Sequence, residues 1–165
     1  MWCADHDGPV RVLPDGCMDL LWLGGRLMVA GPDSVAHVHD GAGPERAVGL
    51  RFDPGRLPAV LGVPAHVVRD ARVPVADLVG STSGWARAID PAVDPCAAVD
   101  PLAAIEQQLA DAPAAHAPPH ELVTRITSGR SVAEVASATG YSSRQLHRRC
   151  LDAFGRPRRL VLQQP

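Results

Sequence analysis

Apolar residues in the first third of the chain come in short runs, each closed by a turn signal. Residues 18–23 form one run, and residues 27–30 form a second after a pair of glycines. Short apolar runs bounded by glycine, proline and aspartate are typical of β-strands. The spacing predicts β structure over residues 9–52, with further strands at 34–38 and 47–52, arranged as a small barrel or sandwich.

Helical signals follow this region. Short helices are predicted at residues 56–61, 65–68 and 75–79, and a longer amphipathic helix at 102–110. Residues 111–119 are rich in alanine and proline and have the composition of a linker. A further helix is predicted over residues 121–127.

Residues 131–154 carry the clearest helical signals in the chain. Ser131 and Ser142 each begin a spacing, Ser-x-x-Glu and Ser-x-x-Gln, that is typical of a capping box at the start of a helix. Gly140 stands where the first helix must end, because glycine accepts a left-handed backbone. The sequence predicts two short helices joined by a tight turn, which is the layout of a helix-turn-helix.

The second of these helices has an apolar face and a polar, basic face. Its apolar residues recur every four positions, and we expect them to pack on a stripe of the first helix: Leu146, Cys150 and Phe154 on Val132, Val135 and Ala136. The candidate DNA contacts lie on the polar face and beyond it: Ser143, Arg144, Gln145, His147, Arg148, Arg149, Arg158 and Arg159. An arginine-rich helix face that is merely solvated remains the alternative.

Charge is divided unevenly along the chain. Residues 121–165 hold eight arginines and three acidic residues, a net charge of +5, whereas residues 1–120 hold eight arginines and fifteen acidic residues, a net charge of −7. A basic segment beside an acidic body is expected when one end of a protein meets phosphate. We therefore predict an N-terminal domain over residues 1–112, a linker over 113–120 and a DNA-binding domain over 121–165.

Composition narrows the remaining function classes. Apolar residues make up 46% of the 165 residues, which is enough for a packed core. No apolar run reaches the ~18 residues of a membrane-spanning helix, and no basic and apolar leader follows Met1, so we expect a cytoplasmic protein without a membrane partner. The four cysteines show no paired spacing, so we expect reduced thiols and neither a metal nor another cofactor.

Two residues of the N-terminal region are candidate ligand contacts, namely Cys17 and Arg51. Cys17 lies in a predicted turn between Asp15 and Asp19, and Arg51 lies in a predicted strand. Arg51 either faces a ligand or pairs with one of these carboxylates. We predict no catalytic residue, because a turn former and a strand residue account for the two aspartates.

His37 and His39 alternate along a predicted strand and can share one face of it. Two such histidines together with Cys17 or His6 could bind a metal ion. A small-molecule-binding or metal-binding protein without strong DNA binding is therefore the alternative function.

Several stretches of the sequence resemble the AraC family of transcription regulators. The segment SVAEVASATGYSSRQLHRRCLDAFG at residues 131–155, followed by Pro157, resembles the first helix-turn-helix of that family. Other stretches are similar to the sensor domain of one actinobacterial branch of the family: LPDGCMDL at 13–20, Trp22, VAGP at 29–32, VGLRF at 48–52, Pro54-Gly55 and LGVP at 61–64.

The resemblance implies an α+β protein, with a small cupin-like or barrel-like β domain and trailing helices followed by an α-helical helix-turn-helix domain. It implies a non-enzymatic, sequence-specific regulator that acts as a homodimer and whose partners are DNA, RNA polymerase and a small-molecule effector. Arg144 and Arg148 are the expected contacts to base edges. AraC-type readers carry two helix-turn-helix units, and only the first is present here, so we expect a truncated reader; a fragment that only dimerises is a further alternative.

Overall fold

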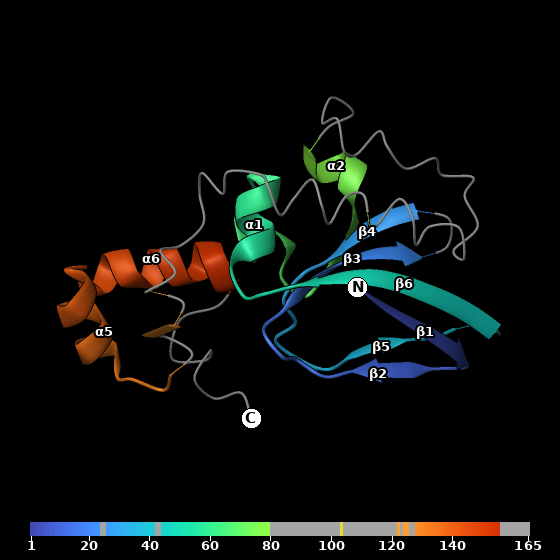
Figure 1. Ribbon diagram of the computed structural model, residues 1–165, viewed down its shortest axis with the longest axis horizontal. Coiled ribbons are helices and arrows are strands. Elements are labelled where there is room, and N and C mark those ends of the chain that lie inside the picture. Colours follow the sequence, from blue (N-terminus) through green and yellow to red (C-terminus); the bar gives the residue numbers. More distant parts are fainter. Residues whose placement is uncertain are drawn as a thin grey trace.

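The computed structural model has an α+β fold in which an antiparallel sheet carries short helices on one face (Figure 1). It describes residues 1–23, 26–41, 44–79, 103, 122, 124–125 and 128–155. The strands are β1 (Trp2–Asp7), β2 (Val10–Val12), β3 (Met18–Leu23), β4 (Arg26–Ala30), β5 (His37–His39), β6 (Pro44–Phe52) and β7 (Arg72–Pro74). The helices are α1 (Arg56–Leu61), η1 (Ala65–Val68), α2 (Val75–Val79), α5 (Val132–Thr139) and α6 (Ser143–Phe154).

Five strands form the main sheet in the order β1-β6-β3-β4-β7, and β2 pairs with β5 in a separate two-stranded ribbon. All of these pairs are antiparallel. The ribbon lies on the side of the sheet away from α1 and α2 (Figure 1). The main sheet is therefore covered by helices on one face and by the ribbon on the other.

The core lies between the sheet and the short helices. Leu20 and Trp22 of β3 alternate with residues that point to the opposite face, and they are fully or almost fully buried beside Val48 and Leu50 of β6. Leu57 of α1 closes this core from the helical side. Leu21 and Leu23 point to the other face of the sheet, toward the ribbon, so the run at residues 18–23 does not alternate strictly between apolar and polar residues.

Two strands were not predicted and one was misplaced. β1 was missed because WCADHD is mostly polar, and as an edge strand it pairs only with β6. β7 has only three residues. The strand expected at residues 34–38 begins at His37 instead, because Ser34 donates hydrogen bonds to the Asp70 carboxylate through its N–H and its hydroxyl, at 2.5 and 2.7 Å, and is held in a loop.

The three short helices expected after the sheet are confirmed with the predicted bounds, the middle one as a 3₁₀ helix. The helix expected at 102–110 and the linker at 113–120 lie outside the described residues, apart from residue 103. Within the part of the chain that the structure describes, no helix combines the length and the apolar character that crossing a membrane requires.

Candidate functional site

Helices α5 and α6 begin at the predicted capping boxes. Ser131 Oγ accepts a hydrogen bond from the Glu134 N–H at 3.3 Å, and the Ser131 N–H donates to Glu134 Oε2 at 2.7 Å. Ser142 and Gln145 repeat the arrangement at 3.3 and 2.9 Å. Each box satisfies two backbone donors that a helix start leaves unpaired. Both predicted boxes are thereby confirmed.

The connection between the two helices is also as predicted. Gly140 ends α5 with a left-handed backbone, at a φ angle of 69°. The buried residues of the pair form a small core together with Leu122, which precedes both helices: Val135, Leu146, Cys150, Ala153 and Phe154. Val132 was expected in this core but is 41% exposed, because it is the first residue of α5 and its side chain tilts back past the helix end.

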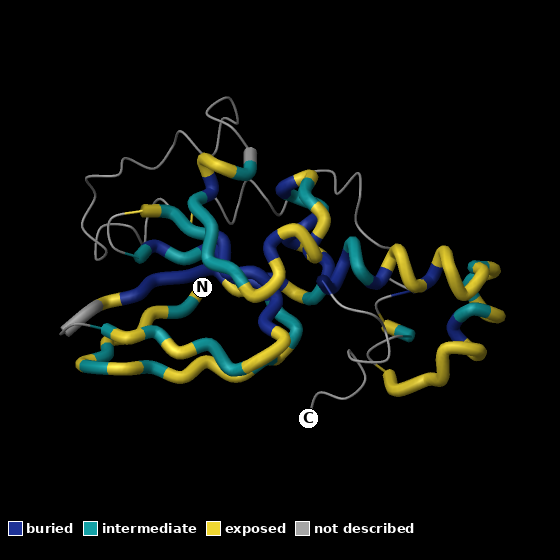
Figure 2. Tube along the Cα trace, turned by 180° about the vertical axis from the view of Figure 1, so that it is seen from behind, coloured by how far each residue is buried: buried dark blue, intermediate teal, exposed yellow. Residues whose placement is uncertain are grey.

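The polar face of α6 is open to solvent, as Figure 2 shows along most of the helix. All of the candidate DNA contacts on it are exposed: Ser143, Arg144, Gln145, His147, Arg148 and Arg149. Arg144 and Arg148 lie one helical turn apart on this face. The Gln145 amide oxygen is occupied by the cap, and the Arg149 guanidinium lies 4.6 Å from the centre of the Tyr141 ring. Arg158 and Arg159 lie outside the described residues.

The C-terminal end of α6 docks on η1 and α1. Arg69 Nη1 donates a hydrogen bond to the Gly155 carbonyl at 3.3 Å, and His66 Nδ1 lies 3.5 Å from Asp152 Oδ1. The N-terminal half of α6, which carries Arg144 and Arg148, points away from the sheet toward α5 (Figure 1). The helix is thus anchored at one end and presents its basic end to solvent.

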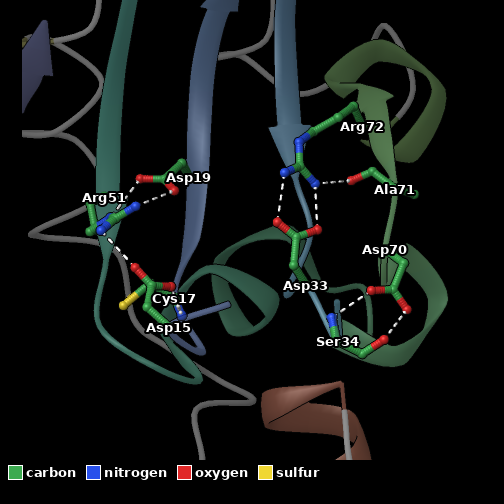
Figure 3. A network of polar contacts seen from close by, with 9 residues as sticks. All are labelled: Asp15, Cys17, Asp19, Asp33, Ser34, Arg51, Asp70, Ala71 and Arg72. Atoms are coloured by element: carbon green, nitrogen blue, oxygen red, sulfur yellow. Dashed lines mark hydrogen bonds and ion pairs between the residues drawn. The ribbon is translucent and has the colours of Figure 1, made fainter. Parts of the chain in front are cut away.

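Arg51 lies at the centre of a cluster of carboxylates (Figure 3). The cluster is on the face of the main sheet that meets the β2–β5 ribbon. Its guanidinium donates to both oxygens of Asp19, at 3.1 and 3.2 Å, and lies 2.7 Å from Asp15 Oδ2. The Trp2 indole N–H also donates to Asp19, at 3.1 Å. Of the two alternatives for Arg51, pairing with a carboxylate is confirmed, and both expected partners contribute.

Cys17 lies beside this cluster. Its backbone N–H donates to Asp15 Oδ1 at 2.9 Å, which closes the predicted turn. Burial raises the pKa of the Cys17 thiol, the carboxylates of Asp15, Asp19 and Asp53 raise it further, and Arg51 opposes them. The thiol is therefore held in its protonated, weakly nucleophilic form.

A second network ties β7 and the loop before it to the loop after β4 (Figure 3). Arg72 binds both oxygens of the buried Asp33 carboxylate, at 2.7 and 2.8 Å. Burial would raise the pKa of Asp70, but hydrogen bonds from the N–H and the hydroxyl of Ser34 lower it below its usual range. Asp33 and Asp70 thus act as structural anchors of this side of the sheet.

A cavity of about 590 Å³ opens between the main sheet and the β2–β5 ribbon. Arg51, His37 and His39 line it, so the two histidines share a face as predicted, whereas Cys17 is not among the lining residues. Sequence reasoning did not assign Trp2 or Arg72 to this site. Among the described residues, no group of three or more His, Cys, Asp or Glu side chains is placed to hold a metal ion.

Residues 1–74 match a family model described as a domain of unknown function, DUF6597. The DUF6597 region contains α1, η1 and all seven strands that the structure describes, and with them every described wall of the cavity. It ends before α5 and α6. No curated protein and no solved structure matches the chain.

Proposed function

We propose that this chain is a sequence-specific DNA-binding transcription regulator of AraC type and has no catalytic activity. In this proposal the α5–α6 pair is a helix-turn-helix, and the DUF6597 region is a cupin-like sensor domain. The observation that carries the proposal is the solvent-exposed pair Arg144 and Arg148 on the projecting half of a doubly capped helix.

The proposed mechanism places the N-terminal half of α6 in the major groove. An arginine can bond O6 and N7 of guanine with two donors, so Arg144 and Arg148, one turn apart, are suited to read neighbouring base pairs. Ser143 and Arg149 are also exposed and are suited to hold phosphates, which fix the register of the helix on DNA, and the exposed His147 is a weaker candidate for a base edge. Gln145 is less suited to a base contact because its amide oxygen caps the helix.

The proposal includes a homodimer because one copy of α6 makes few contacts to DNA. A single reading helix meets few phosphates, so it binds weakly and with strong dependence on salt. A second copy held at fixed spacing makes the second contact intramolecular and raises the overall affinity. RNA polymerase is the further protein partner of this proposal, and a small-molecule effector acts on the DUF6597 region.

Fluorescence anisotropy with DNA from the upstream region of the gene tests the proposal, with scrambled DNA of the same length as the reference. The full-length chain is expected to prefer its own upstream DNA, and Arg144→Ala with Arg148→Ala is expected to abolish this preference. Each base contact is worth about 1–3 kcal/mol, so the double variant loses about 30-fold or more of its preference.

The matched control removes the same two charges from the sheet domain, as Arg11→Ala with Arg26→Ala, since both side chains are exposed and far along the chain from α6. This control should keep the sequence preference. Equal binding of both DNAs by the unmodified chain contradicts the proposal. The cavity then favours the second candidate, a small-molecule-binding protein whose helices are structural.

A further inference from the structure

The cavity between the sheet and the ribbon is bounded by residues of all seven described strands. The register places Asp19, Leu21 and Leu23 of β3 on its floor, because they alternate with the buried core residues of the same strand. Val10 and Val12 of the ribbon face the floor from the other side. Leu21 and Leu23 are only partly buried, so apolar surface remains available to a ligand inside the cavity.

An indole ring forms one wall of this cavity. Trp2 lies directly over Gly49, where a Cβ atom would stand only 2.6 Å from the ring carbon Cζ2, so a larger residue at position 49 would displace the ring. The hydrogen bond from the Trp2 indole N–H to Asp19 fixes the ring in this place. A flat aromatic surface held in advance is suited to pack against a ring or another flat apolar group.

The two arginines that line the cavity are already paired with carboxylates. Arg51 is bound by two carboxylates, and Arg72 forms a two-donor pair with Asp33. The two arginines with their three aspartate partners therefore carry a net charge of −1. An anionic ligand would have to be desolvated against this charge, and neither Arg51 nor Arg72 is free to pair with it, which is unfavourable.

Imidazole groups supply polar contacts elsewhere on the cavity wall. His6 lines the cavity four residues beyond Trp2 on β1, which corresponds to about 13 Å along a strand. The rings of His6 and His39 meet edge to face, with their centres 5.5 Å apart, and His6 Nδ1 is buried without a hydrogen-bond partner among the described residues. Imidazoles can donate to or accept from an uncharged hydroxyl or carbonyl group.

We infer that this cavity binds an uncharged, mostly apolar small molecule, with a flat ring system against Trp2 and a hydroxyl or carbonyl group near His6 and His39. The volume of about 590 Å³ lies within the range of roughly 300–1,000 Å³ found for pockets of such ligands. This inference goes beyond DNA recognition and does not depend on it, because the walls belong to the DUF6597 region alone.

Two fluorescent probes that differ by one charged group test the ligand class with the full chain and without DNA. N-phenyl-1-naphthylamine is uncharged, and 8-anilino-1-naphthalenesulfonate is the same molecule with a sulfonate. The uncharged probe is expected to bind saturably with a Kd on the order of 10 μM, and the sulfonate at least about tenfold more weakly. Equal or tighter binding of the sulfonate, or no saturable binding of the uncharged probe, overturns the inference.

A matched pair of variants locates the binding. Val12 lines the cavity and is 37% exposed, whereas Val38 lies on the opposite face of the same ribbon and is 52% exposed. Val12→Phe should project a larger ring into the cavity and weaken probe binding at least about tenfold, and Val38→Phe should leave it unchanged. Circular dichroism must show the same fold for both variants. If both bind equally, or if a folded Val12→Phe binds as the unmodified chain does, the probe lies elsewhere and the inference fails, whatever the DNA assay shows.

Discussion

At Cys17 a thiol lies among three carboxylates, and this environment determines its reactivity. The pKa of Cys17 is raised, so at a given pH less thiolate is present than for an ordinary cysteine. We expect slower alkylation by iodoacetamide at neutral pH than for the urea-unfolded chain, with a rate that keeps rising above pH ~8.5. Peptide mapping by mass spectrometry measures the rate.

The variant Asp15→Asn tests whether the neighbouring carboxylates contribute to the raised pKa of Cys17. It removes one carboxylate that raises the pKa of Cys17, so the alkylation rate at neutral pH should increase. A native Cys17 that reacts faster than the unfolded thiol would contradict the assigned environment.

The charge of Asp70 is a second property of a single residue that has a measurable effect. Asp70 has a left-handed backbone, at a φ angle of 57°, which asparagine also tolerates, so Asp70→Asn removes the charge without changing the backbone preference. The Asp70 carboxylate accepts two hydrogen bonds from Ser34, and loss of the charge weakens them. The variant should therefore be about 1 kcal/mol less stable than the native chain at pH 7, as measured by urea unfolding.

The pH dependence of this difference follows from the lowered pKa of Asp70. A lowered folded-state pKa contributes stability that is fully present above the unfolded-state pKa and is lost as the pH falls through the folded-state value. The stability gap between the native chain and Asp70→Asn should therefore close in acid. A gap that persists unchanged at low pH would show that the charge is not its cause.

At the scale of single helices and strands, the N-cap of α6 offers the clearest test of what stabilises an element. Ser142→Ala removes the side chain that accepts from the Gln145 N–H, and a lost N-cap typically costs about 1 kcal/mol. Thermal unfolding followed by circular dichroism should show this loss. Ser143→Ala is the control, since Ser143 is the exposed first residue of the helix and makes no cap, and an equal loss in both variants would contradict the assignment.

The elements that the sequence predicted well are those set by neighbouring residues. Both capping boxes span four residues, and Gly140 needs only its own lack of a side chain to end α5. β1 was missed because its polar sequence becomes a strand only through pairing with β6, more than thirty residues away. Local propensity carries no information about such a partner.

The candidate site also has features that the sequence predicts and features that it does not. The exposed face of α6 follows from helical periodicity, and the pairing of Arg51 with nearby carboxylates was one of two predicted alternatives. The cavity could not be predicted, because its walls come from strands at positions 2 to 72 of the chain. Trp2 acquires its role only because Gly49 lies beneath it.

For the molecule as a whole, the decisive contact is the docking of α6 on the sheet domain. The chain passes so closely at Gly155 that a Cβ atom there would stand 2.5 Å from Pro32 Cγ. Gly155 has a left-handed backbone with a φ angle of 69°, and Gly140 has the same angle with nothing within 4 Å of a Cβ atom. Both glycines therefore need a left-handed backbone, but only Gly155 lies at the contact between α6 and the rest of the structure.

Alanine at either glycine should cost about 1–2 kcal/mol, because both positions require the left-handed conformation. Gly155→Ala should cost more than Gly140→Ala in urea unfolding, and the excess measures the docking of α6 on Pro32 and η1. Loss of docking should also separate unfolding transitions that otherwise coincide, as followed by circular dichroism at 222 nm and by tryptophan fluorescence. Equal losses with coincident transitions in both variants would mean that α6 does not depend on this contact, and a ligand in the cavity would then have no rigid path to α6.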